Sequence, residues 1–179
     1  MSKIKRTITF FVFVGLFSLS YQIGSMSKVS IADAMEFMEE FEQIIEGIDA
    51  IGIFLHNLSI SIAMFIPGFG IGWGFYTAWS TGYAFAAIAS VNPALSNIPA
   101  LALLYASPFG LMELTAYSIA TSRSFILIHM MIKKTSLYSA IKPTAIEIGI
   151  AIGLLVAGGF LEDYMIKLSQ ETGFKILGT

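Results

Sequence analysis

The stretch "SPFGLMEL", residues 107–114, places a carboxylate inside a long apolar run and decides how the chain folds. The apolar run extends from Pro99 to Ile132, about 34 residues, whereas one crossing of a bilayer takes roughly 17–25 residues. Proline cannot donate a hydrogen bond to the preceding turn, and serine before proline is a favourable helix start. The sequence therefore predicts a membrane helix broken near Pro108, with Glu113 on the segment after the break.

The composition of the whole chain places it in a bilayer. Of its 179 residues, 56% are hydrophobic and 12% are charged, and the mean hydropathy is +0.78. Several segments approach the ~20 apolar residues that cross a hydrocarbon core of about 30 Å. We expect an all-α, polytopic transmembrane helical bundle of about five spans. The absence of cysteine excludes disulfides and thiolate sites, and no basic tract interleaved with aromatic residues indicates nucleic-acid binding.

Changes in composition divide the chain into four parts. Residues 1–24 pair a basic start with an apolar run, and we interpret them as an N-terminal transmembrane anchor rather than a signal peptide, because the best cleavage match is poor. Residues 25–50 are predicted to form an acidic amphipathic extracytoplasmic helix. Residues 51–161 are predicted to form the transmembrane bundle, and residues 162–179 a short polar tail.

The positions of the basic residues predict the orientation. With a cytoplasmic N-terminus, five crossings leave the acidic helix and the tail outside and six basic residues inside, namely Lys3, Lys5, Arg6, Lys133, Lys134 and Lys142. This count takes residues 99–132 as one net crossing, since two crossings there would move the lysines of 133–142 outside. We therefore expect a multi-pass protein of the cell (plasma) membrane.

Small residues recur every four positions along two of the predicted spans. Helices in lipid associate through close contact and interhelical hydrogen bonds, and small side chains permit both. We expect these ridges to contact other helices of the bundle or the spans of a partner. The helix-packing candidates are Gly70, Gly74, Ala78, Gly82 and Ala86 in one span, and Gly149 and Gly153 in the last.

Glu113 shares a helical stripe with small and hydroxyl-bearing residues, so we expect its side chain to point into the bundle. An ionisable group near the bilayer centre costs at least ~2.5–3.5 kcal/mol on insertion scales, so something must offset that cost. Two interpretations remain open. Glu113 is either a structural clamp at the broken helix or a proton or cation site in a transporter-like cavity. Glu147 is the other intramembrane carboxylate, and His56 could meet both only if three helices converge.

The acidic segment carries apolar residues at spacings of three and four, which indicates an amphipathic helix. Its acidic side is either a solvated surface over the bundle or a docking surface for a partner. The partner-docking candidates are Glu36, Glu39, Glu40 and Glu46.

Short motifs in the chain resemble the integral membrane family named after stage II sporulation protein M. The hallmark of that family is Pro-His-Gly followed by Glu-Leu in a late membrane helix, with an Asn in an early one. The matching residues are Pro108, Gly110, Glu113 and Leu114, together with Asn57 as an intramembrane polar residue. Phe109 replaces the usual His, which weakens the idea of proton chemistry by a His–Glu pair.

The resemblance covers roughly residues 50–160, and the acidic helix is interpreted as an addition specific to this chain. The namesake works in a complex that recruits peptidoglycan-remodelling enzymes, so the resemblance implies an assembly role more readily than catalysis. We expect a non-catalytic accessory or scaffolding subunit of a larger membrane complex, whose partners are other integral membrane subunits and the lipid bilayer.

No metal site and no cofactor is expected, because a membrane-embedded metal needs several converging ligands. A copper-dependent monooxygenase of the ammonia- or methane-oxidising kind is a guess for the host complex, and no residue demonstrates it. The competing interpretation is a small proton- or ion-coupled transporter that uses Glu113.

Overall fold

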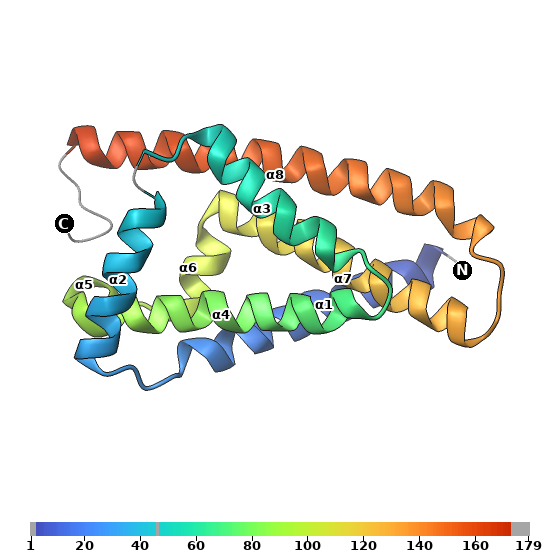
Figure 1. Cartoon of the computed structure of the whole chain (residues 1–179), viewed down its shortest axis with the longest axis horizontal. Coiled ribbons are helices and arrows are strands. Elements are labelled where there is room, and N and C mark those ends of the chain that lie inside the picture. The colour runs from blue at the N-terminus through green and yellow to red at the C-terminus, as the bar shows by residue number, and fades with distance from the viewer. Residues whose placement is uncertain (1–2, 46, 173–179) are drawn as a thin grey trace.

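The computed structural model describes residues 3–45 and 47–172, which form helices and connecting turns without a strand (Figure 1). The helices are α1 (Lys3–Ser25), α2 (Ile31–Ile45), α3 (Ala50–Met64), α4 (Phe69–Val91), α5 (Pro93–Ser96), α6 (Ala100–Ala106), α7 (Pro108–Ile132) and α8 (Tyr138–Thr172). The predicted all-α fold class is therefore confirmed.

The long helices lie side by side along one axis of the molecule (Figure 1). α1 packs most extensively against α4, which runs in the same direction. α7 is the central helix, because it contacts α1, α3, α4, α6 and α8. The strongest packing of α3 is against α8, so α7 and α8 connect the α1–α4 pair to α3.

The break predicted near Pro108 is the boundary between α6 and α7. α6 has seven residues and ends at Ala106, and Ser107 adopts an extended backbone with φ −82° and ψ 125°. α7 then begins at Pro108 and continues for 25 residues, and α6 is steeply inclined to it (Figure 1). Residues 99–132 thus contain one short helix and one long helix, rather than two helices of spanning length.

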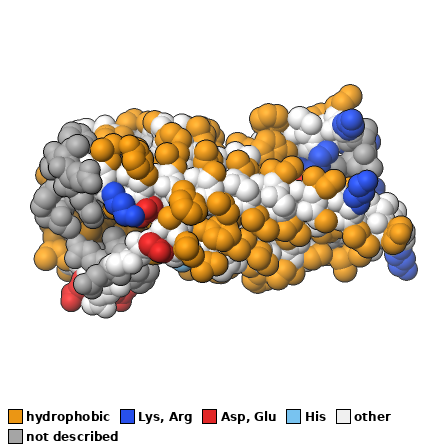
Figure 2. All heavy atoms as spheres, turned by 90° about the horizontal axis from the view of Figure 1, so that it is seen from above, with side chains coloured by type: hydrophobic (Ala, Val, Ile, Leu, Met, Phe, Trp, Pro, Cys, Tyr) orange, Lys and Arg blue, Asp and Glu red, His pale blue; other side chains and the backbone are white. Residues whose placement is uncertain are grey.

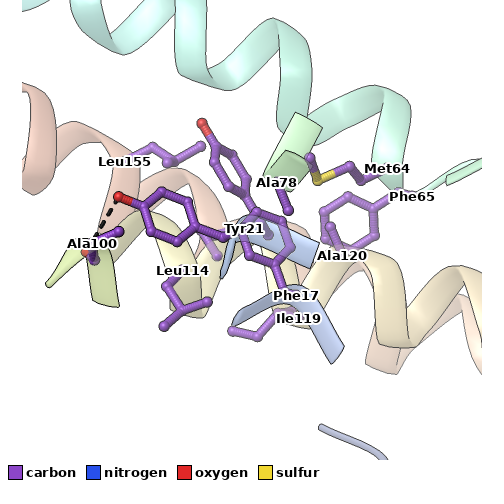
Figure 3. Close-up of a cluster of buried hydrophobic side chains, with 13 residues drawn as sticks. Phe17, Tyr21, Met64, Phe65, Ala78, Ala100, Leu114, Ile119, Ala120 and Leu155 are labelled. Carbon is purple, nitrogen blue, oxygen red and sulfur yellow. Dashed lines mark hydrogen bonds between the residues drawn. The ribbon is translucent and has the colours of Figure 1, made fainter. Parts of the chain in front are cut away.

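The core contains large side chains from several helices (Figure 3). Phe17 and Tyr21 come from α1, Met64 from α3, Leu114 from α7 and Leu155 from α8, and all five are at most 5% exposed. The hydroxyl of Tyr21 donates a hydrogen bond of 3.3 Å to the backbone carbonyl of Ala100 at the start of α6. This contact ties α1 to the short helix that precedes the break.

Two of the described helices are long and apolar enough to cross a membrane, α1 over Lys3–Ser25 and α8 over Tyr138–Leu168. Hydrophobic side chains cover much of the surface in Figure 2. Phe11, Ile150 and Phe160 are among the exposed large hydrophobic residues of α1 and α8. α4 and α7 have sufficient length, 23 and 25 residues, but they are rich in Gly, Ser and Thr. The expected count of five spans is therefore not established by length and hydropathy.

The acidic segment and the described part of the predicted tail contain helices in the structure. The acidic segment forms α2, which packs across α4 at the end where α5 lies (Figure 1). The predicted tail begins within a helix, because α8 continues past Phe160 to Thr172. Pro143 lies in the second turn of α8.

Candidate functional site

Two backbone features form the corner between α6 and α7. The hydroxyl oxygen of Ser107 accepts a hydrogen bond of 3.2 Å from the backbone N–H of Gly110, so it caps the first turn of α7. Pro108 occupies the first helical position, where a missing N–H costs little. Gly110 is buried, and a Cβ atom there would lie 2.9 Å from the carbonyl oxygen of Leu104. The motif residues Ser107, Pro108 and Gly110 therefore form a tight corner.

Glu113 lies about one and a half turns after this corner and joins α7 to α3. The side-chain amide of Asn57 donates a hydrogen bond of 2.6 Å to Oε1 of Glu113. Asn57 is 9% exposed and lies on the inner side of α3, whereas the adjacent His56 is exposed. The two motif residues named by the family resemblance are therefore in direct contact, although 56 positions separate them in the chain.

Two further ionisable side chains lie near Glu113. Glu162 of α8 is close enough for its charge to act on Glu113, and both carboxylates act on the phenol of Tyr117. Leu114, the last motif residue, is 3% exposed and belongs to the core cluster. The site is thus a polar group between α3, α7 and α8, bordered by packed hydrophobic side chains.

A second polar cluster lies further along α7 and joins it to α1 and α8. Glu147 of α8 accepts hydrogen bonds of 2.7 Å from Nε of Arg6 and of 2.7 Å from Nε of Arg123. Arg123 also donates to this carboxylate through Nη2, and Arg6 donates to the hydroxyl of Ser122 at 3.0 Å. Arg123 is only 5% exposed, so its guanidinium is largely removed from solvent. The carboxylate of Glu147 supplies the negative charge that this buried cation needs.

The sequence alone does not predict this second cluster. The sequence places Arg6 in the basic start of the chain and groups Glu147 with Glu113 and His56 as intramembrane ionisable residues. The structure places Glu147 with the two arginines and Glu113 with Asn57, so the two carboxylates belong to separate sites. The sequence does contain one signal for the pairing. Arg123 lies in one apolar segment and Glu147 lies in the next along the chain, and opposite charges inside a membrane usually pair.

The small residues of α4 lie where the helices approach closely. Gly70, Gly74, Ala78, Gly82 and Ala86 are all buried. A Cβ atom on Gly82 would collide with the backbone of Tyr21 in α1, and one on Gly74 would collide with the side chain of Thr121 in α7. Gly24 of α1 meets the carbonyl oxygen of Trp79 in the same way, so glycines on both helices permit the α1–α4 contact.

Gly149 and Gly153 differ from this pattern. Both are exposed on α8, and a Cβ atom on either would meet no other atom within 4 Å. The inner side of α8 instead carries Ala151 and Leu155, at most 2% exposed, and Gly159, whose Cβ would lie 3.1 Å from the backbone of α3. The expected contact of Gly149 and Gly153 within the bundle is thus not found, and their contact with a partner span stays a prediction.

The acidic docking candidates lie on the outer side of α2. Glu36, Glu39 and Glu40 are exposed, while Ala34 is buried and the ring of Phe37 packs edge-on against Tyr83 of α4 at 6.3 Å. Glu46 lies outside the described residues. In the part of the chain that the structure describes, no three His, Asp or Glu side chains converge as a metal ion would need.

Comparison with known proteins gives one family. The family described as stage II sporulation protein M matches residues 7–165. This range includes most of α1, all of α2, the corner at Pro108 and both polar clusters except for Arg6. The acidic helix is therefore inside the family's range rather than an addition beyond it. No curated protein and no solved structure matches the chain. The matched range covers most of the 179 residues, so the chain belongs to the stage II sporulation protein M family of membrane proteins.

Proposed function

We propose that this chain is a non-catalytic scaffolding subunit that crosses the membrane five times and holds other integral membrane subunits in a complex. The five crossings are α1, α3, α4, the α6–α7 unit and α8, which alternate in direction along the long axis (Figure 1). At 1.5 Å per residue, α4 and α7 extend for about 34 and 38 Å, which suffices for a hydrocarbon core of about 30 Å. α3 has 15 residues and would need the loop after Met64 to complete its crossing.

The distribution of charge supports a cytoplasmic N-terminus. Most of the Lys and Arg side chains visible in Figure 2 gather at one end of the molecule, and the visible Asp and Glu side chains gather at the other. The basic end contains the start of α1 and the turn between α7 and α8, while α2 lies at the opposite end (Figure 1). The positive-inside rule assigns the basic end to the cytoplasm.

The observation that carries the scaffold proposal is that both intramembrane carboxylates bind side chains of other helices. Glu113 of α7 binds Asn57 of α3, and Glu147 of α8 binds Arg6 of α1 and Arg123 of α7. Each carboxylate therefore accepts hydrogen bonds that hold α7 or α8 to a neighbouring helix. Two cavities lie near the ends of the bundle, and neither is lined by Glu113 or Glu147.

The exposed carboxylates of α2 supply the surface for a partner. α2 uses one side to pack on α4 and presents Glu36, Glu39 and Glu40 on the other. A basic segment of another membrane subunit fits this surface by charge, and the exposed Gly149 and Gly153 of α8 offer a close contact for one of its spans. The family match and the fold give no support to a copper-dependent monooxygenase as the host.

The scaffold proposal is tested by native mass spectrometry of the complex extracted with a mild detergent from the source membrane. We expect a second membrane subunit at fixed stoichiometry, lost when Glu36, Glu39 and Glu40 are all changed to Gln. Lys28→Gln is the control, because Lys28 is exposed just before the same helix and lies outside the acidic surface. A chain that remains a lone monomer under these conditions contradicts the proposal.

A small proton- or ion-coupled transporter is the second candidate, and the position of Glu162 favours it. Two carboxylates close enough to influence each other, Glu113 and Glu162, are typical of sites that exchange a proton or bind a cation. The transporter proposal predicts that liposomes with the purified chain show ion-coupled flux. Glu113→Gln would then abolish the flux while circular dichroism stays unchanged, and the absence of wild-type flux rejects this candidate.

A further inference from the structure

A groove of about 660 Å³ lies between the first turns of α1 and the last turns of α7. Its polar lining includes Lys5 and His129, and its apolar lining includes Ile8, Phe125 and Met130. A volume in this range is typical of sites for small organic ligands. Neither polar cluster described above contributes to the lining, so the groove is a separate feature of the basic end.

The lining of the groove is divided by depth. α1 enters the bundle from the basic end, so Lys5 lies nearer to that end than Ile8. α7 leaves the bundle at the same end, so His129 lies nearer to it than Phe125. Lys5, His129 and Met130 therefore mark the outer part of the groove, while Ile8 and Phe125 extend toward the middle of the bundle. Ile8 is 58% exposed and Phe125 is 42% exposed, so this apolar part is open.

The charge around the groove is positive. Lys133 and Lys134 follow α7 directly and are exposed, and Lys3 is exposed on the first turn of α1. The nearby cluster holds two guanidiniums, those of Arg6 and Arg123, for the single carboxylate of Glu147. An anion at the outer part of the groove would thus be attracted by several cations.

We propose that this groove binds an anionic phospholipid, with the phosphate near Lys5 and His129 and an acyl chain along Ile8 and Phe125. A free phosphate would satisfy the basic part and leave the apolar part unused, whereas a phospholipid matches both. Basic pockets beside membrane helices on the cytoplasmic side are a known kind of lipid headgroup site. The inference rests on the proposed membrane crossing and orientation, and it does not depend on the scaffold role.

The test is a lipid titration of the purified full chain in a neutral detergent, followed by native mass spectrometry. The wild type should bind phosphatidylglycerol at least fivefold more tightly than phosphatidylcholine. Lys5→Gln should weaken the binding of phosphatidylglycerol about fivefold, the effect of removing one basic residue near a lipid phosphate. Lys142→Gln is the matched control, because Lys142 is exposed at the start of α8 and does not line the groove, and it should change the affinity less than twofold.

A second variant tests the apolar part of the groove. Ile8→Trp adds a bulky ring to an exposed position, so it should fill the groove and reduce the number of bound phosphatidylglycerol molecules by one without loss of helical content. Equal affinity for the two lipids, or equal effects of Lys5→Gln and Lys142→Gln, would overturn the proposal. Displacement of the bound lipid by millimolar inorganic phosphate would overturn it as well, because it would indicate a site for a free anion. Lipid binding by a chain that recruits no partner would leave this inference standing while the scaffold proposal fails.

Discussion

Replacing Glu147 with Gln removes the negative charge that holds Arg6 and Arg123 together. Three hydrogen bonds connect the two guanidiniums to this carboxylate, and Arg123 is 5% exposed, so solvent cannot take its place. Removing one partner of a buried ion pair costs about 3–5 kcal/mol, because the other charge stays behind unpaired. Gln keeps one acceptor oxygen, so we expect a loss at the lower end, about 3 kcal/mol of unfolding free energy.

The same helix provides a control, an ion pair whose cation is exposed to solvent. Asp163 and Lys167 form an ion pair of 2.7 Å on α8, and the side chain of Lys167 is 62% exposed. Because solvent can stabilise the exposed ammonium of Lys167 after its partner is removed, the pair contributes between about 0 and 1 kcal/mol, and Asp163→Asn should have little effect. The two single variants therefore remove one carboxylate each and differ in the burial of its partners.

The measurement is the unfolding equilibrium of the purified chain in mixed micelles of a mild detergent and dodecyl sulfate, followed by circular dichroism. Adding Arg6→Gln to each background gives a double-mutant cycle, in which we expect a coupling of at least about 1 kcal/mol between positions 6 and 147. If Glu147→Gln costs no more than Asp163→Asn, or if the cycle shows no coupling, the cluster does not hold α1, α7 and α8 together.

Four further predictions use the same unfolding assay. Gly82→Val should destabilise the chain by about 1–3 kcal/mol, because the added side chain collides with the α1 backbone. Gly149→Ala should instead be neutral or should stabilise α8 by up to about 1 kcal/mol, since the position is open and alanine favours a helix. Ser107→Ala should cost about 1 kcal/mol through the loss of the helix cap, and a normal stability would show that the cap is dispensable. Asn57→Leu should cost about 1–3 kcal/mol because Glu113 loses its amide donor, whereas an unchanged midpoint would mean that the bond contributes nothing.

Much of the fold follows from signals that are local in the sequence. The break at Pro108 depends on the missing N–H of proline and on the serine before it, and both features are visible within the stretch 107–110. The burial of the α4 glycines follows from their four-residue spacing, because helix periodicity places residues that are four apart on one side. The end of α8 does not follow from the apolar pattern. A helix that leaves the bilayer can continue through polar sequence, as α8 does to Thr172.

The pairing of the polar groups could not be derived in the same way. Arg6 and Glu147 are 141 positions apart, and which cation meets which carboxylate depends on the order of the helices around the bundle. The glycines of α8 show the same limit. Gly149 and Gly153 have the spacing of a packing ridge, yet Ala151 and Leu155 are the residues that face the bundle. Because this span is apolar on all sides, its periodicity alone does not distinguish the side that packs from the side that is exposed.

The positions of the two polar clusters along α7 bear on the choice between a scaffold and a transporter. Glu113 and Arg123 are ten residues apart, so their contacts lie about 15 Å from each other along the helix axis. Two attachments at that separation fix both the rotation and the axial position of α7 relative to α3, α1 and α8. A transporter that alternates between two open states would have to break one of these attachments in every cycle. Either Arg123 or Asn57 would then be buried without its partner, which costs free energy. A scaffold keeps both, and rigid placement of the surfaces on α2 and α8 is what such a subunit requires.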